Sequence, residues 1–564
     1  MIRRMSRLAL GIGAVIASLA AATSAQATPS ENATVNLIRL LVQQGVLKQD
    51  QADALIRQAE AEAVQARQAA AQAAPSAPGA PGEVRVQYVP AIVRDQIRDE
   101  VKAEVMAQAK KENWAAPNTF PDWASRISLE GDMRLRSESR YFSSNNSDRL
   151  IDYARLNEKG PYDVNPRSNT QLPPLLNSRE DRENLLRLRA RLGLRATLSP
   201  SWSAALRIAT GSDSGPVSTT QTLGGGFAKK DVWLDQGYLT YKPDERLTLT
   251  GGRMPNPFMT TDLLYSGDLN LDGLAANFQQ PLDSELGLFG TVGAFPVEYT
   301  SDTATTSSGF DKVESDTNWL YGAQIGARWQ PDADNSLKAA LAYYRFDDIE
   351  GKRSSPCTPW NGAPACDTDE SRPAFMQKGN TLMLLRDITP DPTRPTTTPE
   401  PQFVGLASEF NLVDLNLVWD TALFDGFKLR SQAHYVRNLA YDEGEMNKRS
   451  TGRLANNVDE NGNIQSGDTA WMLQFVLGNA LDLKKHGDWN LYAGYKRIEP
   501  DALPDGFNDS SFHLGGTNAK GWFVGANYGF AENVYGSARW LSAEEVYGAP
   551  FEIDVLQFEV NTRF

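Results

Sequence analysis

The sequence predicts an all-β membrane protein: an antiparallel transmembrane β-barrel of about 16 strands, preceded by an N-terminal periplasmic helical region. Three observations predict it. Apolar and polar residues alternate over many segments of about ten residues. Short and long connections alternate between these segments, and tryptophans gather at both of their ends, as in the aromatic belts of membrane barrels.

The first 27 residues have the pattern of an export signal. Three arginines near the start precede an apolar stretch over residues 8–22, and the small-residue sequence AQA ends at position 27. Residues 1–27 are therefore predicted to be a signal peptide.

Three segments are predicted between the signal and the barrel. Residues 28–73 have the apolar spacing of a helical hairpin, and residues 74–90 form a Pro/Ala/Gly linker with a short extended piece. Residues 91–112 predict an amphipathic helix with one narrow apolar stripe. Such a stripe fits a coiled coil with neighbouring subunits or a helix that lies on the barrel rim, and both interpretations remain open.

The barrel is predicted over residues 127–564. In the first strand Leu129, Met133 and Leu135 occupy alternate positions, and charged residues stand between them. The predicted strands are 127–141, 184–198, 202–211, 230–242, 246–253, 272–280, 285–295, 318–330, 336–346, 410–420, 427–437, 469–477, 489–498, 520–530, 534–541 and 551–564. Short links such as 199–201 and 243–245 alternate with long ones such as 347–409, which predicts turns on the periplasmic side and loops outside.

Two tryptophan belts follow from this order of strands. Trp202, Trp329, Trp419 and Trp489 stand at turn-proximal strand ends, whereas Trp233, Trp319, Trp471, Trp522 and Trp540 stand at loop-proximal ends. Ordinary core aromatics of a soluble β-protein would not sort by connection length, so the belts favour a membrane barrel.

Arginines alternate with the leucines of the first strands. An arginine facing lipid at mid-bilayer would cost about 2–4 kcal/mol, so these side chains are predicted to face the lumen. The predicted pore-lining residues are Arg134, Arg136, Arg187, Arg189, Arg191, Arg195 and Arg207, with Glu130 and Asp132 offsetting part of the charge. These pore-lining charges would select solutes by charge. The alternative is a solvated lumen without selectivity.

The connection over residues 254–271 is predicted to fold into the barrel. It would bring Asp262 and Asp268 opposite the arginines, so that opposed charges across a water-filled waist orient polar solutes. His434 is predicted to face water on the lumen side.

The two cysteines lie close together in a long polar segment. Cys357 and Cys366 are predicted to form a disulfide, because the exported chain meets an oxidising compartment. They lack histidines at zinc-ligand spacing, and the sequence contains no phosphate-binding loop, zinc helix or nucleophile elbow. No metal, no cofactor and no catalytic residues are therefore predicted.

Several segments of the chain together resemble the putative porin family of proteobacterial outer-membrane β-barrels. They are TVNLIRLLVQQGVLKQDQADALI, VRVQYVPAIVRDQIRDEV, WASRISLEGDMRLR, LDQGYLTY, GGRMPNPF, LNLDGLAANF and the terminal Phe564. The resemblance covers nearly the whole chain after residue 27 and implies an outer-membrane porin, but carries little about its solute.

The sequence thus predicts a non-enzymatic porin in the outer membrane of a Gram-negative bacterium, with its N-terminal helices in the periplasm. It would form a water-filled channel for passive diffusion of small hydrophilic solutes or ions. The expected partners are outer-membrane lipid, lipopolysaccharide and two further copies in a trimer; the net charge of −14 argues against nucleic acid. Two alternatives remain, a barrel enzyme and an envelope tether acting through the periplasmic helices.

Overall fold

The computed structural model describes residues 126–564, except 213–214, 300–316, 363–365 and 425. The predicted signal peptide, helical hairpin, linker and amphipathic helix lie outside the described residues. Within the described part of the chain, none of the helices is both long enough and apolar enough to cross a membrane.

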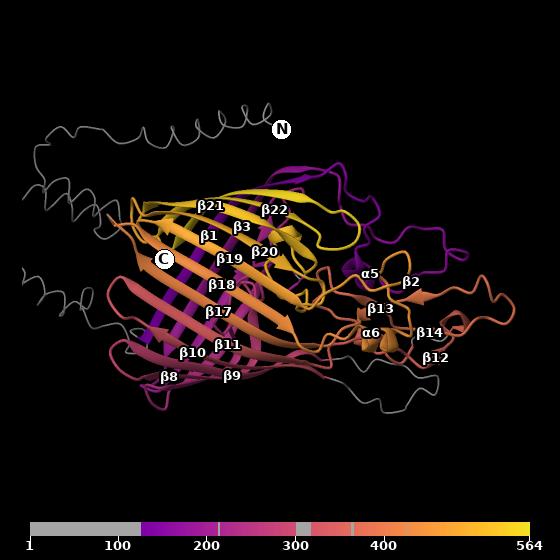
Figure 1. Cartoon of the computed structure of the whole chain (residues 1–564), viewed down its shortest axis with the longest axis horizontal. Helices are drawn as coiled ribbons and strands as arrows, with labels where there is room; N and C mark the ends of the chain where they lie inside the picture. Colours follow the sequence, from indigo (N-terminus) through magenta and orange to yellow (C-terminus); the bar gives the residue numbers. More distant parts are fainter. Residues whose placement is uncertain (1–125, 213–214, 300–316, 363–365, 425) are drawn as a thin grey trace, which may run out of the picture. The chain divides into compact units, whose positions relative to one another are not determined.

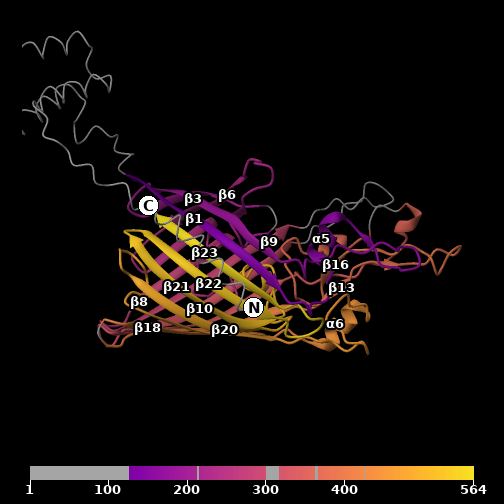
Figure 2. The same cartoon turned by 90° about the horizontal axis from the view of Figure 1, so that it is seen from above.

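Sixteen antiparallel strands form a closed barrel (Figure 1). They are β1 (Ile127–Phe142), β3 (Arg182–Thr197), β4 (Trp202–Thr210), β6 (Val232–Tyr241), β7 (Leu247–Pro255), β8 (Asn270–Pro281), β9 (Leu286–Tyr299), β10 (Thr317–Trp329), β11 (Asn335–Asp347), β17 (Phe410–Ala422), β18 (Lys428–Asn438), β19 (Thr469–Gly478), β20 (Trp489–Ile498), β21 (Ala519–Ala531), β22 (Val534–Glu544) and β23 (Ile553–Arg563). Each pairs with the next along the chain, and β23 pairs with β1 to close the barrel (Figure 2). All sixteen predicted strands are confirmed.

The two faces of the strands differ as the alternation predicts. On β1, Leu129 is 67% exposed and Leu135 is 43% exposed, whereas Arg136 between the outward positions is 6% exposed. Tryptophans with exposed side chains stand at both ends of the strands, for example Trp202 at the turn end and Trp522 at the loop end. An apolar outer face with aromatic ends suits a cylinder surrounded by lipid.

Connection lengths separate the two ends of the barrel. Links such as 198–201 and 532–533 join strands at the end where the chain terminates (Figure 1). The opposite end carries the long connections 143–181, 211–231, 256–269, 348–409, 439–468, 499–518 and 545–552. The predicted alternation of short turns and long loops is confirmed.

Several long connections contain structure of their own. Their elements are α5 (Tyr153–Lys159), β2 (Tyr162–Asp163), β5 (Gln221–Thr222), β12 (Pro356–Cys357), η3 (Pro359–Asn361), η4 (Asp369–Ser371), β13 (Leu382–Leu384), β14 (Asp387–Ile388), β15 (Pro401–Gln402), β16 (Val404–Leu406), α6 (Glu443–Ser450) and η5 (Phe512–Leu514). Both α-helices begin at an aspartate whose carboxylate accepts a backbone N–H of the first turn, which satisfies one free donor there.

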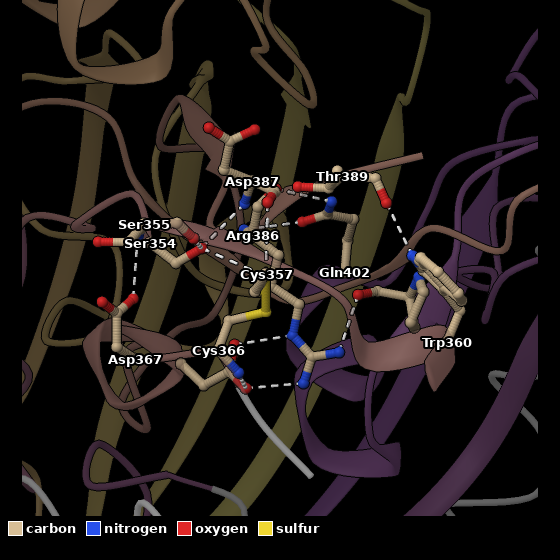
Figure 3. Close-up of a disulfide and its surroundings, with 12 residues drawn as sticks. Ser354, Ser355, Cys357, Trp360, Cys366, Asp367, Arg386, Asp387, Thr389 and Gln402 are labelled. Atoms are coloured by element: carbon tan, nitrogen blue, oxygen red, sulfur yellow. Dashed lines mark hydrogen bonds and ion pairs between the residues drawn. A yellow bond between two sulfur atoms is a disulfide. The ribbon is translucent and has the colours of Figure 1, made fainter. Parts of the chain in front are cut away.

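A disulfide joins Cys357 to Cys366 within the 348–409 connection, as the sequence predicts (Figure 3). Nearby, the buried Arg386 guanidinium donates two hydrogen bonds to the Asp369 carboxylate, at 2.8 and 2.7 Å. Leu385 and Phe403 belong to a small apolar core beneath these contacts. The connection is therefore a folded cap and not an open loop.

The main apolar core lies inside the barrel, toward the loop end. Inward side chains of the strands, such as Phe295 and Tyr344, pack against Phe258 and Leu264 of the 256–269 connection and Phe507 of the 499–518 connection. The Phe258 ring meets the Tyr344 ring edge-on, with 5.1 Å between their centroids. The inward connections thus fill part of the lumen.

Candidate functional site in the barrel interior

Arginines from β1 and β3 stand directly opposite each other in the strand register. Arg134 is paired with Arg189, and Arg136 with Arg187. Like charges at opposite positions destabilise a sheet, so carboxylates must lie among them. The sequence places the arginines by simple alternation, but the carboxylates come from several distant segments.

Two carboxylates, those of Asp132 and Asp268, pair with the arginines in the middle of this row. Arg191 contacts Asp132 at 2.7 Å and Arg189 contacts it at 2.9 Å. Asp268 of the 256–269 connection contacts the same two arginines, at 3.1 Å from Arg189 and 3.2 Å from Arg191. Asp268 also accepts hydrogen bonds from the backbone N–H and hydroxyl of Thr219, at 3.2 and 3.0 Å.

Glu138 organises the part of the wall nearer the loops. Its carboxylate contacts Arg136 at 3.4 Å, Arg140 at 2.7 Å and Arg187 at 2.9 Å, and it accepts a hydrogen bond from the Gln557 amide at 3.0 Å. Three guanidinium groups therefore share one carboxylate, which leaves a local excess of positive charge.

Glu559 of the last strand completes the wall. It contacts Arg136 at 2.5 Å and Arg134 at 4.0 Å, and Arg134 also donates to the Thr220 hydroxyl at 2.5 Å. Altogether six arginines contact four carboxylates: Arg134, Arg136, Arg140, Arg187, Arg189 and Arg191 with Asp132, Glu138, Asp268 and Glu559. We call these ten residues the arginine wall.

The remaining predicted pore residues lie apart from the arginine wall. Arg195 and Glu130 form a pair at 3.5 Å near the turn end, and both side chains are 53% exposed. Arg207 contacts Asp235 of β6 at 2.5 Å. These residues share the inner face with the wall but do not contact its members.

The 256–269 connection folds into the barrel, as predicted. Thr261 hydrogen-bonds to His434 of β18 at 2.6 Å, and the Gln324 amide of β10 accepts the Met259 N–H at 2.8 Å. The fold therefore anchors this connection to strands on the far side of the barrel from β1.

The prediction that a water-filled gap separates Asp262 and Asp268 from the arginines is wrong. Asp268 touches Arg189 and Arg191 directly, and Asp262 contacts Lys496 at 2.7 Å and Arg539 at 3.8 Å on other strands. Direct pairing forms because the inward connection packs against the wall instead of standing away from it.

The prediction that His434 faces water is also wrong. Its side chain is fully buried, with Nε2 2.6 Å from the Asp414 carboxylate and Nδ1 2.6 Å from the Thr261 hydroxyl. The strand face was predicted correctly, but the inward connection covers the ring. The alternation of residues along β18 cannot show that a distant connection packs over His434.

Sequence reasoning missed four members of the wall and its surroundings: Glu138, Arg140, Glu559 and Asp235. For the first three the signal was present, because they alternate with outward residues of β1 and β23. Asp235 could not be found in this way, since a register shift in the β4–β6 pairing interrupts the alternation beside it.

A cavity of about 660 Å³, here called the external vestibule, opens beside the loop-side part of the wall. Its charged lining consists of Arg140, Arg155, Arg182, Arg187 and Lys378 against Asp152 and Glu158. Five cations thus line the cavity with two acids, and two of the cations, Arg140 and Arg187, also pair with Glu138 of the wall. Cations still outnumber acids when Glu138 is included. This local balance is opposite in sign to the net charge of the chain.

In the described ranges, no three His, Cys, Asp or Glu side chains are grouped closely enough to hold a metal ion.

Residues 31–564 match the family described as "Putative porin". The chain belongs to the putative porin family. Membership supports a passive diffusion channel of the outer membrane.

Solved structures of outer-membrane proteins are similar in fold. The channel DcaP of Acinetobacter baumannii is 10% identical with a TM-score of 0.36, covering 78% of this chain and 97% of its own. A loop-deletion mutant of OmpT of Vibrio cholerae is 10% identical with a TM-score of 0.37, covering 78% and 100%. Salmonella typhi OmpF in complex with daunomycin is 10% identical with a TM-score of 0.37, covering 78% and 97%. No curated protein sequence is significantly similar to the chain.

Proposed function

We propose that this porin passes small hydrophilic solutes down their gradients and favours anions over cations. The observation that carries the proposal is the external vestibule, where five cationic side chains face two acids beside the arginine wall. A water-filled cavity lined by one sign of charge concentrates ions of the opposite sign.

The arginine wall supports the same preference. Its six arginines exceed its four carboxylates, and each arginine is held by at least one ion pair. Fixed positive charge next to the permeation path lowers the energy of an anion without reorganisation of the protein. Side chains held by several partners also keep the path at a constant width.

The reversal potential of the purified porin in a planar bilayer tests this proposal. Under a salt gradient we expect the sign that reports anion preference. Charge reversal by Arg189→Glu together with Arg191→Glu should lower the anion-to-cation permeability ratio. An unchanged ratio would remove these residues from selectivity, and cation preference in the unmodified porin would refute the proposal.

We also propose that three copies assemble in the outer membrane, in contact with lipopolysaccharide, with the N-terminal helices in the periplasm. The support is the apolar stripe of residues 91–112, which repeats every four residues and needs a partner. Mass measurement of the detergent-extracted protein should give three copies per particle. A single-copy particle that conducts normally would refute the trimer.

A further inference from the structure

A second cavity, of about 560 Å³, lies inside the barrel toward the turn end. Its wall is formed by β8, β9, β10 and β11, and its roof by residues 257–259 of the inward connection. The Gln324 amide fixes this roof, since it accepts the Met259 N–H at 2.8 Å and donates to the Met259 carbonyl at 2.9 Å. The two hydrogen bonds hold the upper boundary of the cavity, and the cavity shares no lining residue with the external vestibule.

Two cations stand directly opposite each other in this cavity. Arg328 of β10 and Lys338 of β11 are paired in the strand register and both line the cavity. Every arginine of the arginine wall contacts a carboxylate, but among the described residues neither Arg328 nor Lys338 has a carboxylate within 4.0 Å. Like charges at opposite positions are destabilising, and a bound anion would relieve this repulsion.

An aromatic ring lies beside the cation pair. Phe289 of β9 is opposite Gly326 of β10, two residues before Arg328. A Cβ on residue 326 would approach the Phe289 Cζ to 2.2 Å, so the tip of the ring reaches over the glycine. The glycine thus leaves room for an apolar surface next to two positive charges.

Two acids border the same cavity on the 282–285 turn. Asp283 accepts hydrogen bonds from the backbone N–H groups of Glu285 and Leu286, at 2.8 and 2.7 Å, so its carboxylate stabilises the turn. Glu285 is exposed at the mouth. Both lie beyond ion-pair distance of the two cations. Asp420 and Asp482 are near enough to attract Lys338 electrostatically, but their ion pairs are with Arg430, at 2.7 and 3.7 Å. The cation pair therefore has no direct carboxylate partner among the described residues.

From these features we infer that Arg328, Lys338 and Phe289 form a binding subsite for small carboxylates that carry a flat, apolar body. The carboxylate would bridge the guanidinium and the ammonium, and the body would pack on the Phe289 ring. This inference rests on the proposed anion preference. It adds a class of solute and a second anion-binding site, on the turn side of the lumen, to the external vestibule on the loop side.

Benzoate is the probe for this subsite. We expect benzoate, added to either side of a bilayer in turn, to reduce the single-channel current in a saturable way. Acetate lacks the ring and benzamide lacks the charge, so each should block at least tenfold more weakly. Arg328→Gln combined with Lys338→Gln should raise the apparent Kd for benzoate about tenfold, the effect of losing about 1.4 kcal/mol of charge-assisted contact.

Two further variants make the test specific. Lys428→Gln removes another lysine from the inner face of β18 near the turns, outside the cavity, and should leave the benzoate Kd unchanged. Phe289→Leu should weaken benzoate but not acetate.

Several outcomes would overturn the inference. Equal block of the unmodified porin and the double variant, or equal weakening by Lys428→Gln, would each do so. Anion preference without saturable benzoate block would refute the subsite and leave the proposed function standing. Cation preference would refute the proposed function itself.

Discussion

Replacing Asp268 with asparagine removes one negative charge from the centre of the arginine wall. The shape of the side chain is nearly kept, so Thr219 can still donate to the remaining oxygen. Arg189 and Arg191 keep Asp132 but lose their second carboxylate. The wall then holds six arginines and three carboxylates, and we expect stronger anion preference.

The size of the change follows from Coulomb's law. A unit charge about 7 Å from a passing ion in water changes its energy by about 0.6 kcal/mol. The change has opposite sign for anion and cation, so the permeability ratio would shift by about sevenfold without screening. Salt at about 0.1 M has a screening length of about 10 Å, which reduces the expected shift to about threefold.

The assay is the reversal potential across a bilayer under a salt gradient, measured for Asp268→Asn and for the unmodified porin. Glu445→Gln is a matched control, because this exposed glutamate of α6 forms its one ion pair within the described part of the chain with Lys448 of the same helix, on the loop surface. The control should leave the ratio unchanged. A ratio for Asp268→Asn that stays constant or moves toward cations would refute the role assigned to the wall.

Three further predictions follow from the fold. Leu192 is 47% exposed on the outer face of β3, so Leu192→Arg should destabilise the barrel by about 2–4 kcal/mol in lipid, measured by urea unfolding, whereas Leu172→Arg in an external loop should not. Burial raises the pKa of Asp505 in the 499–518 connection to about 7, so the packing of this connection should be most stable below about pH 4 and should weaken as the pH rises through 7. Limited proteolysis between pH 5 and 8 should show increasing cleavage there, and Asp505→Asn should abolish this pH dependence. Replacing Cys357 and Cys366 with serine should destabilise the cap by about 2–3 kcal/mol without changing barrel unfolding, measured by hydrogen exchange.

The barrel could be predicted from the sequence because lipid imposes one pattern on every strand. A strand between lipid and lumen must alternate, and a one-residue error in register would place arginines in the bilayer. The order of turns and loops then follows from the spacing of the strands. Even the least regular strands, such as β7 and β22, occupy the expected positions.

The interior could not be predicted in the same way. His434 is buried because residues some 170 positions earlier cover it, and strand alternation cannot show such a contact. Asp268 was expected to face the arginines across water, but the packing of the inward connection brings it into direct contact with them. Long-range loop packing depends on three-dimensional fit, which no local period in the sequence records.

Cysteine accessibility along β3 tests the central claim most directly. The two native cysteines form a disulfide and do not react, so single cysteines at positions 187–195 can be labelled in membranes with a charged thiol reagent. We predict labelling at the arginine positions 187, 189, 191 and 195 and protection at the leucine positions 188, 192 and 194. Labelling of the leucine positions, or no alternation at all, would contradict a water-filled barrel whose inner face carries the arginine wall.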